Sequence, residues 1–211
     1  MEKQLRKIVD KYKPAFSKGG KFGFLHSTFD AFETFLFVPN TVTRRGSHIR
    51  DANDLKRTMI IVIIALLPAL LFGMYNVGYQ HFAAIADPVS QAMWFKCWWY
   101  GFVRMLPMIL VSYIVGLGIE FAVAQHKGEE VNEGFLVTGL LIPMIMPIDI
   151  PLWILALAVA FSVVFGKEVF GGTGMNVFNP ALLARAFVFF AYTPKISGEQ
   201  VWIRGFSKGG A

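Results

Sequence analysis

The chain has 211 residues, of which 55% are hydrophobic and 16% are charged. Soluble domains carry about 25% charged residues, so this composition argues against a soluble enzyme and favours a membrane protein. The formal net charge is +6, and most of the basic residues precede the first long apolar run. An excess of lysine and arginine beside such a run marks the cytoplasmic side of a membrane, so we expect no nucleic-acid partner.

Cys97 is the only cysteine. It cannot form an internal disulfide or a four-cysteine iron–sulfur site, so any redox cofactor held by this chain alone must be organic or bound without thiolates. The four histidines have no metal-ligand spacing, and we predict no metal site. Residues 1–22 contain no apolar core of a signal peptide, so the N-terminus is expected to stay cytoplasmic.

The first 57 residues are predicted to form a basic, aromatic-rich cytoplasmic segment. Four apolar residues recur there at helical spacing among lysines: Leu5, Ile8, Val9 and Tyr12. This pattern predicts an amphipathic helix at the membrane surface, which Pro14, Gly19 and Gly20 are expected to break.

Residues 58–193 are predicted to form an all-α membrane domain of about five transmembrane helices. The predicted spans are 59–75, 102–124, 134–148, 152–165 and 180–192. We expect an outer loop at 76–101, a tight outer turn around Asp149, and a periplasmic tail at 194–211. Several spans are shorter than the roughly 20 residues of a full crossing and are interrupted by Pro or Gly. Such segments are typical of transport or cofactor sites, and their odd number favours one half of an inverted-repeat fold.

Glu120 lies among apolar residues near the inner end of the second predicted span. Ionisable groups inside membrane helices are costly and are usually functional, so this carboxylate is a candidate for cation or proton uptake. A glutamate that reaches the interface and pairs with Lys127 is the alternative. Gly116 and Gly118 precede it, and helix packing is their simplest interpretation.

The segment GGTGMNVFNPALLAR, residues 171–185, combines a glycine-rich turn with an Asn-Pro helix start. Asn176 and Asn179 can both donate and accept hydrogen bonds, which suits the polar edge of a ring such as isoalloxazine. The alternative is a re-entrant turn in which the asparagines only cap the helix. A phosphate loop is disfavoured because no Lys-Ser/Thr follows the glycines.

Four segments, RRGSHIRDANDLKR, EEVNEGFLVTG, KEVFGGTGMNVFNPALLARAFVFFAY and ISGEQVW, resemble the family of the B subunit of Na⁺-translocating NADH:quinone oxidoreductases. The resemblance runs from about residue 22 to the C-terminus. The related D subunit of the Rnf electron-transport complex shares the GG-x-G-x-N-x-x-NP element, but would not be expected to carry the long N-terminal segment. It is the alternative family, and a channel or carrier without redox function is a third hypothesis.

The resemblance implies a subunit of a six-subunit complex of a bacterial inner membrane, which passes electrons from NADH to ubiquinone, exports sodium, and is inactive as a single chain. It implies riboflavin contacts at Asn176 and Asn179, with Trp202 as a weaker candidate. The family's glycine pair near the quinone site corresponds to Gly116 and Leu117, and its sodium-linked glutamate corresponds to Glu120. Five crossings would place the N-terminus in the cytoplasm and the C-terminus in the periplasm.

The family also carries FMN bound covalently through phosphate to a threonine, in an outer loop after the VW element. Here the residues after that element read IRGFSKGGA and contain no threonine. The resemblance therefore implies that the acceptor threonine is absent from this chain. It also leads us to expect a truncated or split version of the family's fold.

Overall fold

The computed structural model describes residues 55–127 and 134–193, together with positions 6, 9–11, 13, 14, 16, 29, 46, 47, 196 and 202–205. Over these residues the structure is helical and contains no strand, which confirms the predicted all-α class. The chain divides into two compact units, one of residues 1–58 and 120–132 and the other of residues 59–119 and 133–211.

The smaller unit is described at few positions of the N-terminal segment. Each described position from 6 to 16 is helical, including Pro14, and Gly19 and Gly20 of the predicted helix break lie outside the described residues. Proline fits a helix wherever its missing N–H would be unpaired, as in a first turn. The Phe16 and Phe29 rings stack with their centroids 4.8 Å apart. Leu5, Ile8 and Tyr12 of the predicted amphipathic helix lie outside the described residues, as does most of the 194–211 tail.

In the larger unit, helix α3 spans Leu55–Ala84, well beyond the predicted 59–75. Its part Thr58–Ala84 is long and apolar enough to cross a membrane. Tyr75 and Tyr79, one turn apart, have ring centroids 5.9 Å apart and line one side of the continuing helix. The predicted outer loop 76–101 is therefore too long: residues 76–84 continue this helix and 94–101 begin the next long helix, because the isolated polar residues interrupt the apolar run without interrupting the helix.

The chain reverses at the short helix α4, Pro88–Ala92. Asp87 caps this helix by accepting a hydrogen bond of 3.0 Å from the backbone N–H of Ser90. Hydrogen bonds from the side chain and backbone of Ser90 lower the pKa of Asp87. Asp followed by Pro is a strong helix-start pair, and this pair marks the boundary between the first two long helices.

Helix α5 runs over Trp94–Lys127 and is also long enough to cross a membrane. The predicted span 102–124 lies inside it, and the tryptophans predicted for an outer loop lie in its first turns. Helices α3 and α5 meet backbone to backbone at two glycines. A Cβ added to Gly78 would overlap the Cys97 carbonyl, and one added to Gly101 would overlap the Met74 carbonyl. Small residues of this kind let membrane helices approach closely.

Two proline-bounded helices follow. Helix α6 spans Phe135–Ile145, and Met146 is extended at φ −97° and ψ 149° because the residue before a proline avoids the α region. The turn between Pro147 and Pro151 is closed by a backbone hydrogen bond of 3.2 Å from Ile150 to Pro147, as predicted around Asp149. Helix α7 then spans Leu152–Gly166.

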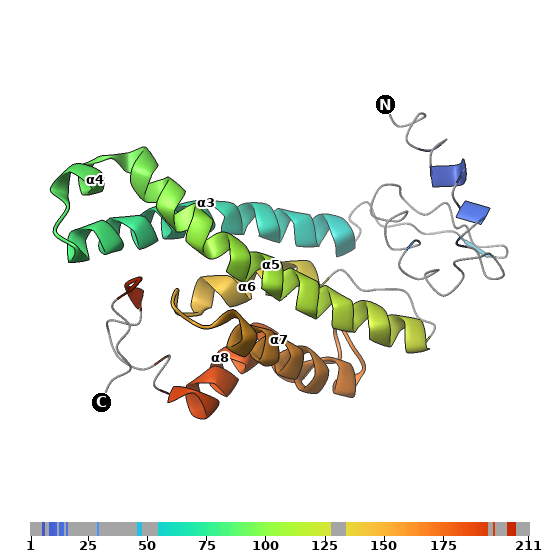
Figure 1. The fold of residues 1–211 in the computed structure, drawn as a ribbon. Helices are drawn as coiled ribbons and strands as arrows, with labels where there is room; N and C mark the ends of the chain where they lie inside the picture. The colour runs from blue at the N-terminus through green and yellow to red at the C-terminus, as the bar shows by residue number, and fades with distance from the viewer. Residues whose placement is uncertain are drawn as a thin grey trace. The chain divides into compact units, whose positions relative to one another are not determined.

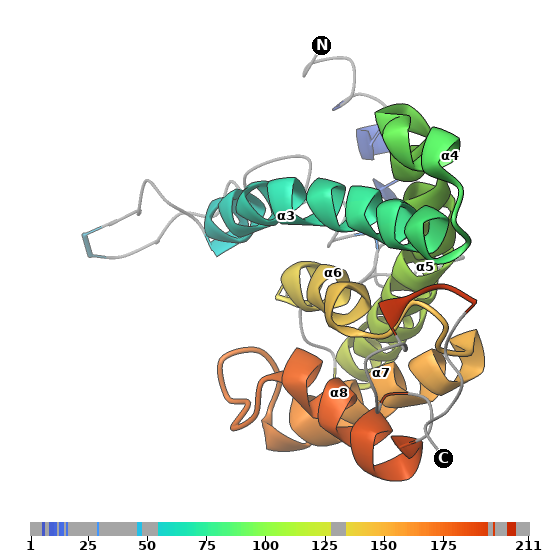
Figure 2. The ribbon, with the colours of Figure 1, turned by 90° about the vertical axis from the view of Figure 1, so that its left-hand side faces the viewer.

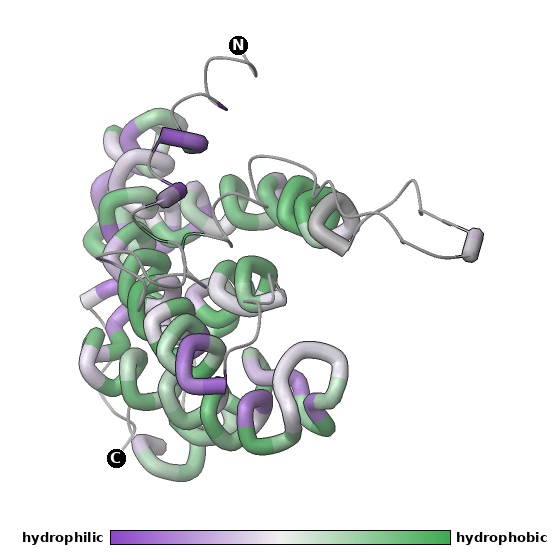
Figure 3. The backbone as a smooth tube through the Cα atoms, turned by 90° about the vertical axis from the view of Figure 1, so that its right-hand side faces the viewer, coloured by the Kyte–Doolittle hydropathy of each residue, from purple (hydrophilic) through white to green (hydrophobic). Residues whose placement is uncertain are grey.

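Helix α7 leads through a 3₁₀ turn, η2 (Glu168–Phe170), into the glycine-rich loop, and α8 spans Pro180–Ala191. The stretch Leu152–Phe170 is the third helical segment long enough to cross a membrane, and α6 and α8 are shorter apolar helices. The five predicted apolar segments are thus all helical. Figure 3 shows that much of the length of these helices is coloured as hydrophobic.

The packed core of the larger unit is formed mainly by α6, α7 and α8 (Figure 1). Figure 2 shows α6 between α3 and the α7–α8 pair. Helices α7 and α8 approach closely because Gly166 faces Leu183, whose side chain would collide with an added Cβ. Several apolar side chains on these helices are completely buried: Ile142, Leu155, Ala158, Val159, Val163, Ala184 and Val188.

Candidate functional site

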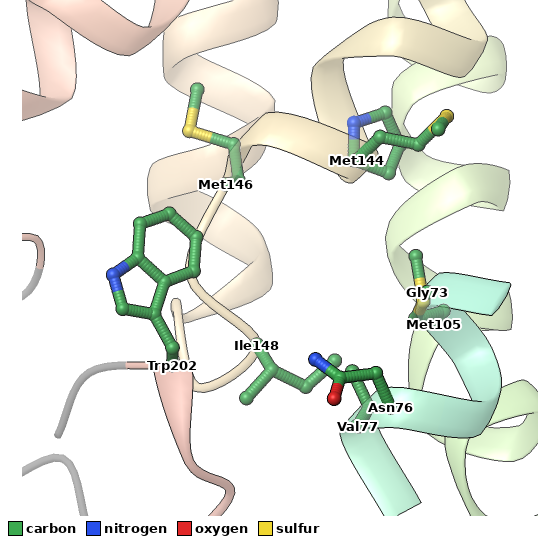
Figure 4. Close-up of a pocket in the computed structure, with 9 residues that line it drawn as sticks. Gly73, Asn76, Val77, Met105, Met144, Met146, Ile148 and Trp202 are labelled. Atoms are coloured by element: carbon green, nitrogen blue, oxygen red, sulfur yellow. The ribbon is translucent and has the colours of Figure 1, made fainter. Parts of the chain in front are cut away.

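A pocket of about 250 Å³ lies in the larger unit, between α3, α5, the end of α6 and the Trp202 segment (Figure 4). Its lining contains three thioethers, one indole and one carboxamide, and no charged side chain. The lining residues are Gly73, Asn76, Val77, Met105, Pro143, Met144, Met146, Ile148 and Trp202. Such a lining is suited to a flat, neutral molecule with one hydrogen-bonding edge.

Asn76 is the polar element of this pocket, and Figure 4 shows its carboxamide directed into the open space toward Ile148 and Trp202. It lies on α3, eight residues before the helix ends at Ala84. Its side chain is exposed and has no hydrogen-bond partner among the described residues. A carboxamide without partners is costly on an apolar helix, so a partner from outside the protein would stabilise it.

Arg185 holds two walls of the pocket in place. It lies on the apolar helix α8, is half-buried, and donates a hydrogen bond to the carbonyl of Ile145 at the end of α6. The last carbonyls of a helix have no partner within the helix, and a cation there also complements the helix dipole. The Arg185 guanidinium carbon lies 5.2 Å from the centre of the Trp202 ring, within the range of a cation–π interaction.

The Trp202 segment is also fixed at the turn between α6 and α7. Arg204 pairs with the carboxylate of Asp149, whose other oxygen accepts a hydrogen bond of 2.7 Å from the backbone N–H of Gly205. A ring nitrogen of His81, near the end of α3, lies 2.9 Å from the Arg204 carbonyl oxygen. These contacts bring together three regions that were predicted to lie on the same, outer side.

The loop of residues 171–179, called the asparagine loop below, is held by hydrogen bonds from its own side chains. Asn176 accepts a hydrogen bond of 3.3 Å from the N–H of Gly174 and donates one of 3.0 Å to the Phe178 carbonyl. Asn179 caps α8 by accepting from the N–H groups of Ala181 at 2.9 Å and Leu182 at 3.4 Å. The predicted Asn-Pro helix start is thereby confirmed.

The structure does not bring Trp202 to the two asparagines. The Trp202 segment is tied to Asp149 just before α7, whereas Asn176 and Asn179 follow α7 at its other end. With about 1.5 Å of rise per residue, the 15 residues of α7 separate these ends by roughly 20 Å. The contact of Trp202 with α8 is made at Arg185, six residues after Asn179.

Gly116 lies where α5 meets α6. A Cβ there would overlap the ring of Phe135, which is 1% exposed, so a close helix contact explains this glycine. Tyr113, on the same helix, donates a hydrogen bond of 2.6 Å to the Leu136 carbonyl and fixes the same contact. Leu117 is partly buried and packs against the core. Gly116 and Leu117 are thus neighbours on α5, and neither lines the pocket described above.

Glu120 belongs to the smaller unit and lies in the last turns of α5. Its side chain is only 4% exposed. Burial of a carboxylate is costly unless it is paired, hydrogen-bonded or protonated, so this position has a stronger constraint than an ordinary interfacial glutamate.

Asn76 and Arg185 were not among the residues that the sequence singled out. A signal for both exists, because each is a polar residue inside an apolar helix. The signal at Asn76 is obscured by the neighbouring polar residues, which resemble a loop. The partners of Arg185 are 40 and 17 residues away in sequence and show no spacing that could reveal them.

The three long apolar helices and two shorter ones define an integral membrane protein with a mostly apolar pocket. The chain belongs to the NQR2, RnfD, RnfE family, whose model matches residues 42–208.

Curated relatives extend this match. The chain is 43% identical to the B subunit of the Na(+)-translocating NADH-quinone reductase of Pseudomonas aeruginosa (strain LESB58), over 96% of the chain and 56% of that relative. It is 43% identical to the protein of the same name from Chromohalobacter salexigens, over 94% of the chain and 53% of the relative. It is 42% identical to the protein of the same name from Azotobacter vinelandii, over 94% of the chain and 54% of the relative. The chain spans about half the length of these relatives.

Proposed function

We propose that this chain acts as a membrane subunit of a sodium-translocating NADH:quinone reductase. The observation that carries the proposal is the identity of 43% over nearly the whole chain to relatives named as the B subunit of that enzyme. The family model covers the Rnf-type proteins as well, but the relatives quoted above are named for the sodium-translocating reductase. NADH oxidation, quinone reduction and sodium export would then be activities of the assembled complex, of which ubiquinone is the electron acceptor.

The chain would cross a bacterial inner membrane several times, with its N-terminus in the cytoplasm and its C-terminus in the periplasm. Contacts within the larger unit support this arrangement. His81, Asp149 and Arg204 come together, and all three belong to regions predicted to be periplasmic. Gly134, which begins the third predicted span, and Thr173, which follows the fourth, approach each other, and five crossings would place both of these span ends at the cytoplasmic side. Reporter fusions after residues 5 and 211 should report opposite sides, and two cytoplasmic signals would contradict the proposal.

Riboflavin is the flavin that we propose for this chain, with contacts from Asn176 and Asn179. The asparagine loop offers hydrogen-bonding groups that support flavin contacts. Residues 177–179 before α8 are exposed, and Asn179 uses only its oxygen for the helix cap, which leaves its amide N–H groups available. Bound flavin would supply electron transfer.

Quinone contacts are proposed at Gly116 and Leu117, and cytoplasmic sodium uptake at Glu120. The carboxylate is buried near the end of an apolar helix, a position at which ionisable groups are usually functional. Oxygen ligands are the ligands that hard cations prefer. The role of Glu120 would therefore be to collect the ion, and electron transfer would not depend on it directly.

The test uses the assembled complex and measures the rate of quinone reduction against sodium concentration. Glu120→Ala should raise the half-saturating sodium concentration by about tenfold or more, which corresponds to the loss of one charge-assisted contact. Glu120→Asp should lie between this variant and the wild type because it keeps the charge with a shorter reach. An unchanged half-saturating concentration in Glu120→Ala would assign the residue a structural role.

A further inference from the structure

We propose that Arg104 binds the phosphate group of an anionic phospholipid at the α4 end of the hairpin formed by α3 and α5. At this end the last turns of α3, helix α4 and the first turns of α5 come together (Figure 1). Which leaflet of the membrane supplies the lipid rests on the orientation proposed above. The charge and the exposure of Arg104 do not depend on that orientation.

Arg104 is a cation for which this part of the chain supplies no acidic partner. Asp87 is the only acidic residue between positions 59 and 119, and it caps α4 and interacts electrostatically with Lys96. The Arg104 side chain is exposed and has no hydrogen bond or ion pair among the described residues. A charge on an apolar helix is costly in a membrane, so an anion from outside the chain would stabilise it.

The structure directs Arg104 toward the end of the hairpin, where a lipid headgroup would lie. Side chains of a helix point toward its N-terminus, which for α5 is the end beside α4. The Arg104 guanidinium carbon accordingly lies 5.5 Å from the centre of the Tyr100 ring, one turn nearer to that end. Tyr100 is fixed in turn by stacking on His81 of α3, with ring centroids 4.4 Å apart. The edge of the guanidinium remains available for two parallel hydrogen bonds to a phosphate.

Lys96 supplies a second positive charge at the same end. Its Nζ lies 5.4 Å from the centre of the Phe82 ring and donates a hydrogen bond to the Ser90 hydroxyl. Phe82 also contacts Tyr100, with ring centroids 5.5 Å apart, so both cations lie beside one group of contacting rings. Eight residues of α5, about 12 Å, separate Lys96 from Arg104. A zwitterionic headgroup would bring its own cation toward Lys96, and this repulsion favours a lipid with a net negative charge.

The surface beside Arg104 suits the acyl chains of such a lipid. Trp99 and Val103 are exposed one turn apart on α5, and Val103 adjoins Arg104 in sequence. Phe95 is also exposed and stacks on Trp99 at a centroid distance of 6.3 Å. Exposed aromatic rings near the end of an apolar helix are typical of the membrane interface. A free phosphate ion would gain nothing from this apolar surface, whereas a phospholipid would cover it.

The experiment places the whole chain in phosphatidylcholine vesicles with a minor fraction of phosphatidylglycerol whose acyl chains are brominated and quench tryptophan fluorescence on contact. Residues 1–57 contain no tryptophan, so the signal does not report lipid bound to the basic N-terminal segment. Relative to brominated phosphatidylcholine at the same fraction, brominated phosphatidylglycerol should bind the wild type about fivefold more tightly. Arg104→Gln should remove most of this preference, and Arg104→Lys should keep part of it. Trp99→Phe should reduce the quenching that is specific to phosphatidylglycerol.

Lys127→Gln is the matched control, because it removes one positive charge at the opposite end of α5 and should leave the preference unchanged. An Arg104→Gln variant with the wild-type preference overturns the proposal, since the quenching then reports a general attraction between a basic chain and anionic lipid. A wild type without any preference overturns it as well and leaves an acidic protein partner as the occupant of this face. Loss of the preference on adding inorganic phosphate at constant ionic strength would assign the site to a soluble anion instead.

These outcomes are separate from the tests of the proposed function. Reporter fusions and the sodium dependence of the assembled complex can give their expected results whether or not Arg104 binds lipid. Circular dichroism of Arg104→Gln shows whether the fold is kept, and Arg104→Lys provides a second variant in which the charge is retained.

Discussion

Replacing Arg185 by methionine tests whether a half-buried cation holds the α6–α8 contact and the Trp202 segment together. The change keeps most of the side-chain volume and removes the charge. Two interactions disappear, the hydrogen bond to the Ile145 carbonyl and the cation–π contact with Trp202 at 5.2 Å. A hydrogen bond from a charged donor contributes about 1.5–3 kcal/mol, and a cation–π contact contributes about 0.5–2 kcal/mol.

The measured loss of unfolding free energy should be smaller than the sum of these two contributions. A half-buried guanidinium on an apolar helix is itself costly, and methionine recovers part of that cost. We therefore expect Arg185→Met to lower the free energy of unfolding by about 1–3 kcal/mol. The assay is reversible unfolding in mixed detergent micelles, followed by circular dichroism and by tryptophan fluorescence, whose agreement tests the two-state assumption.

Arg104→Met is the matched control. Arg104 also lies in a long apolar helix, and its guanidinium carbon is 5.5 Å from the centre of the Tyr100 ring. It is exposed and has no hydrogen bond among the described residues. We expect this variant to lose no more than about 0.5 kcal/mol. Equal losses in the two variants would refute the reasoning, because the effect of Arg185 would then not come from the helix-end carbonyl.

Two further predictions concern helix packing and the outer turn. Gly78→Ala should destabilise the protein by about 1–3 kcal/mol because its Cβ overlaps the backbone of α5, whereas Gly118→Ala, which meets nothing within 4 Å, should be neutral or stabilising by up to about 1 kcal/mol. Similar unfolding free energies for these two variants would contradict the close crossing of α3 and α5. A double-mutant cycle of Asp149→Asn and Arg204→Met should give a coupling energy of about 1 kcal/mol, and a value of zero would show that this ion pair does not stabilise the protein.

The local elements of this protein follow from its sequence. Asn179-Pro180 opens α8 as predicted, because the cap is made by hydrogen bonds to N–H groups two and three residues away. Asp149 lies in the predicted turn because the two flanking prolines force the backbone out of the helical region. The all-α class and the apolar segments follow from composition and run length alone.

Helix lengths were less well predicted, since a polar residue in an apolar helix resembles the start of a loop. The sequence could not show that α3 continues through Asn76. The continuing helix is accompanied by the ring contact of Tyr75 with Tyr79 and by the contact of Gly78 with α5, and these contacts are seen only in the structure. Residue 76 was accordingly assigned to an outer loop.

Only the tertiary structure decided how the polar residues are grouped. Asn76 and Trp202 are 126 positions apart and line one pocket, and Arg185 reaches a carbonyl 40 residues earlier. Trp202 is likewise held by Arg185 of α8 through a contact that no local pattern predicts. Contacts within a turn or a cap depend on neighbouring residues and can be read from spacing. Contacts between helices depend on their crossing points, which here are set by glycines whose partners no local pattern reveals.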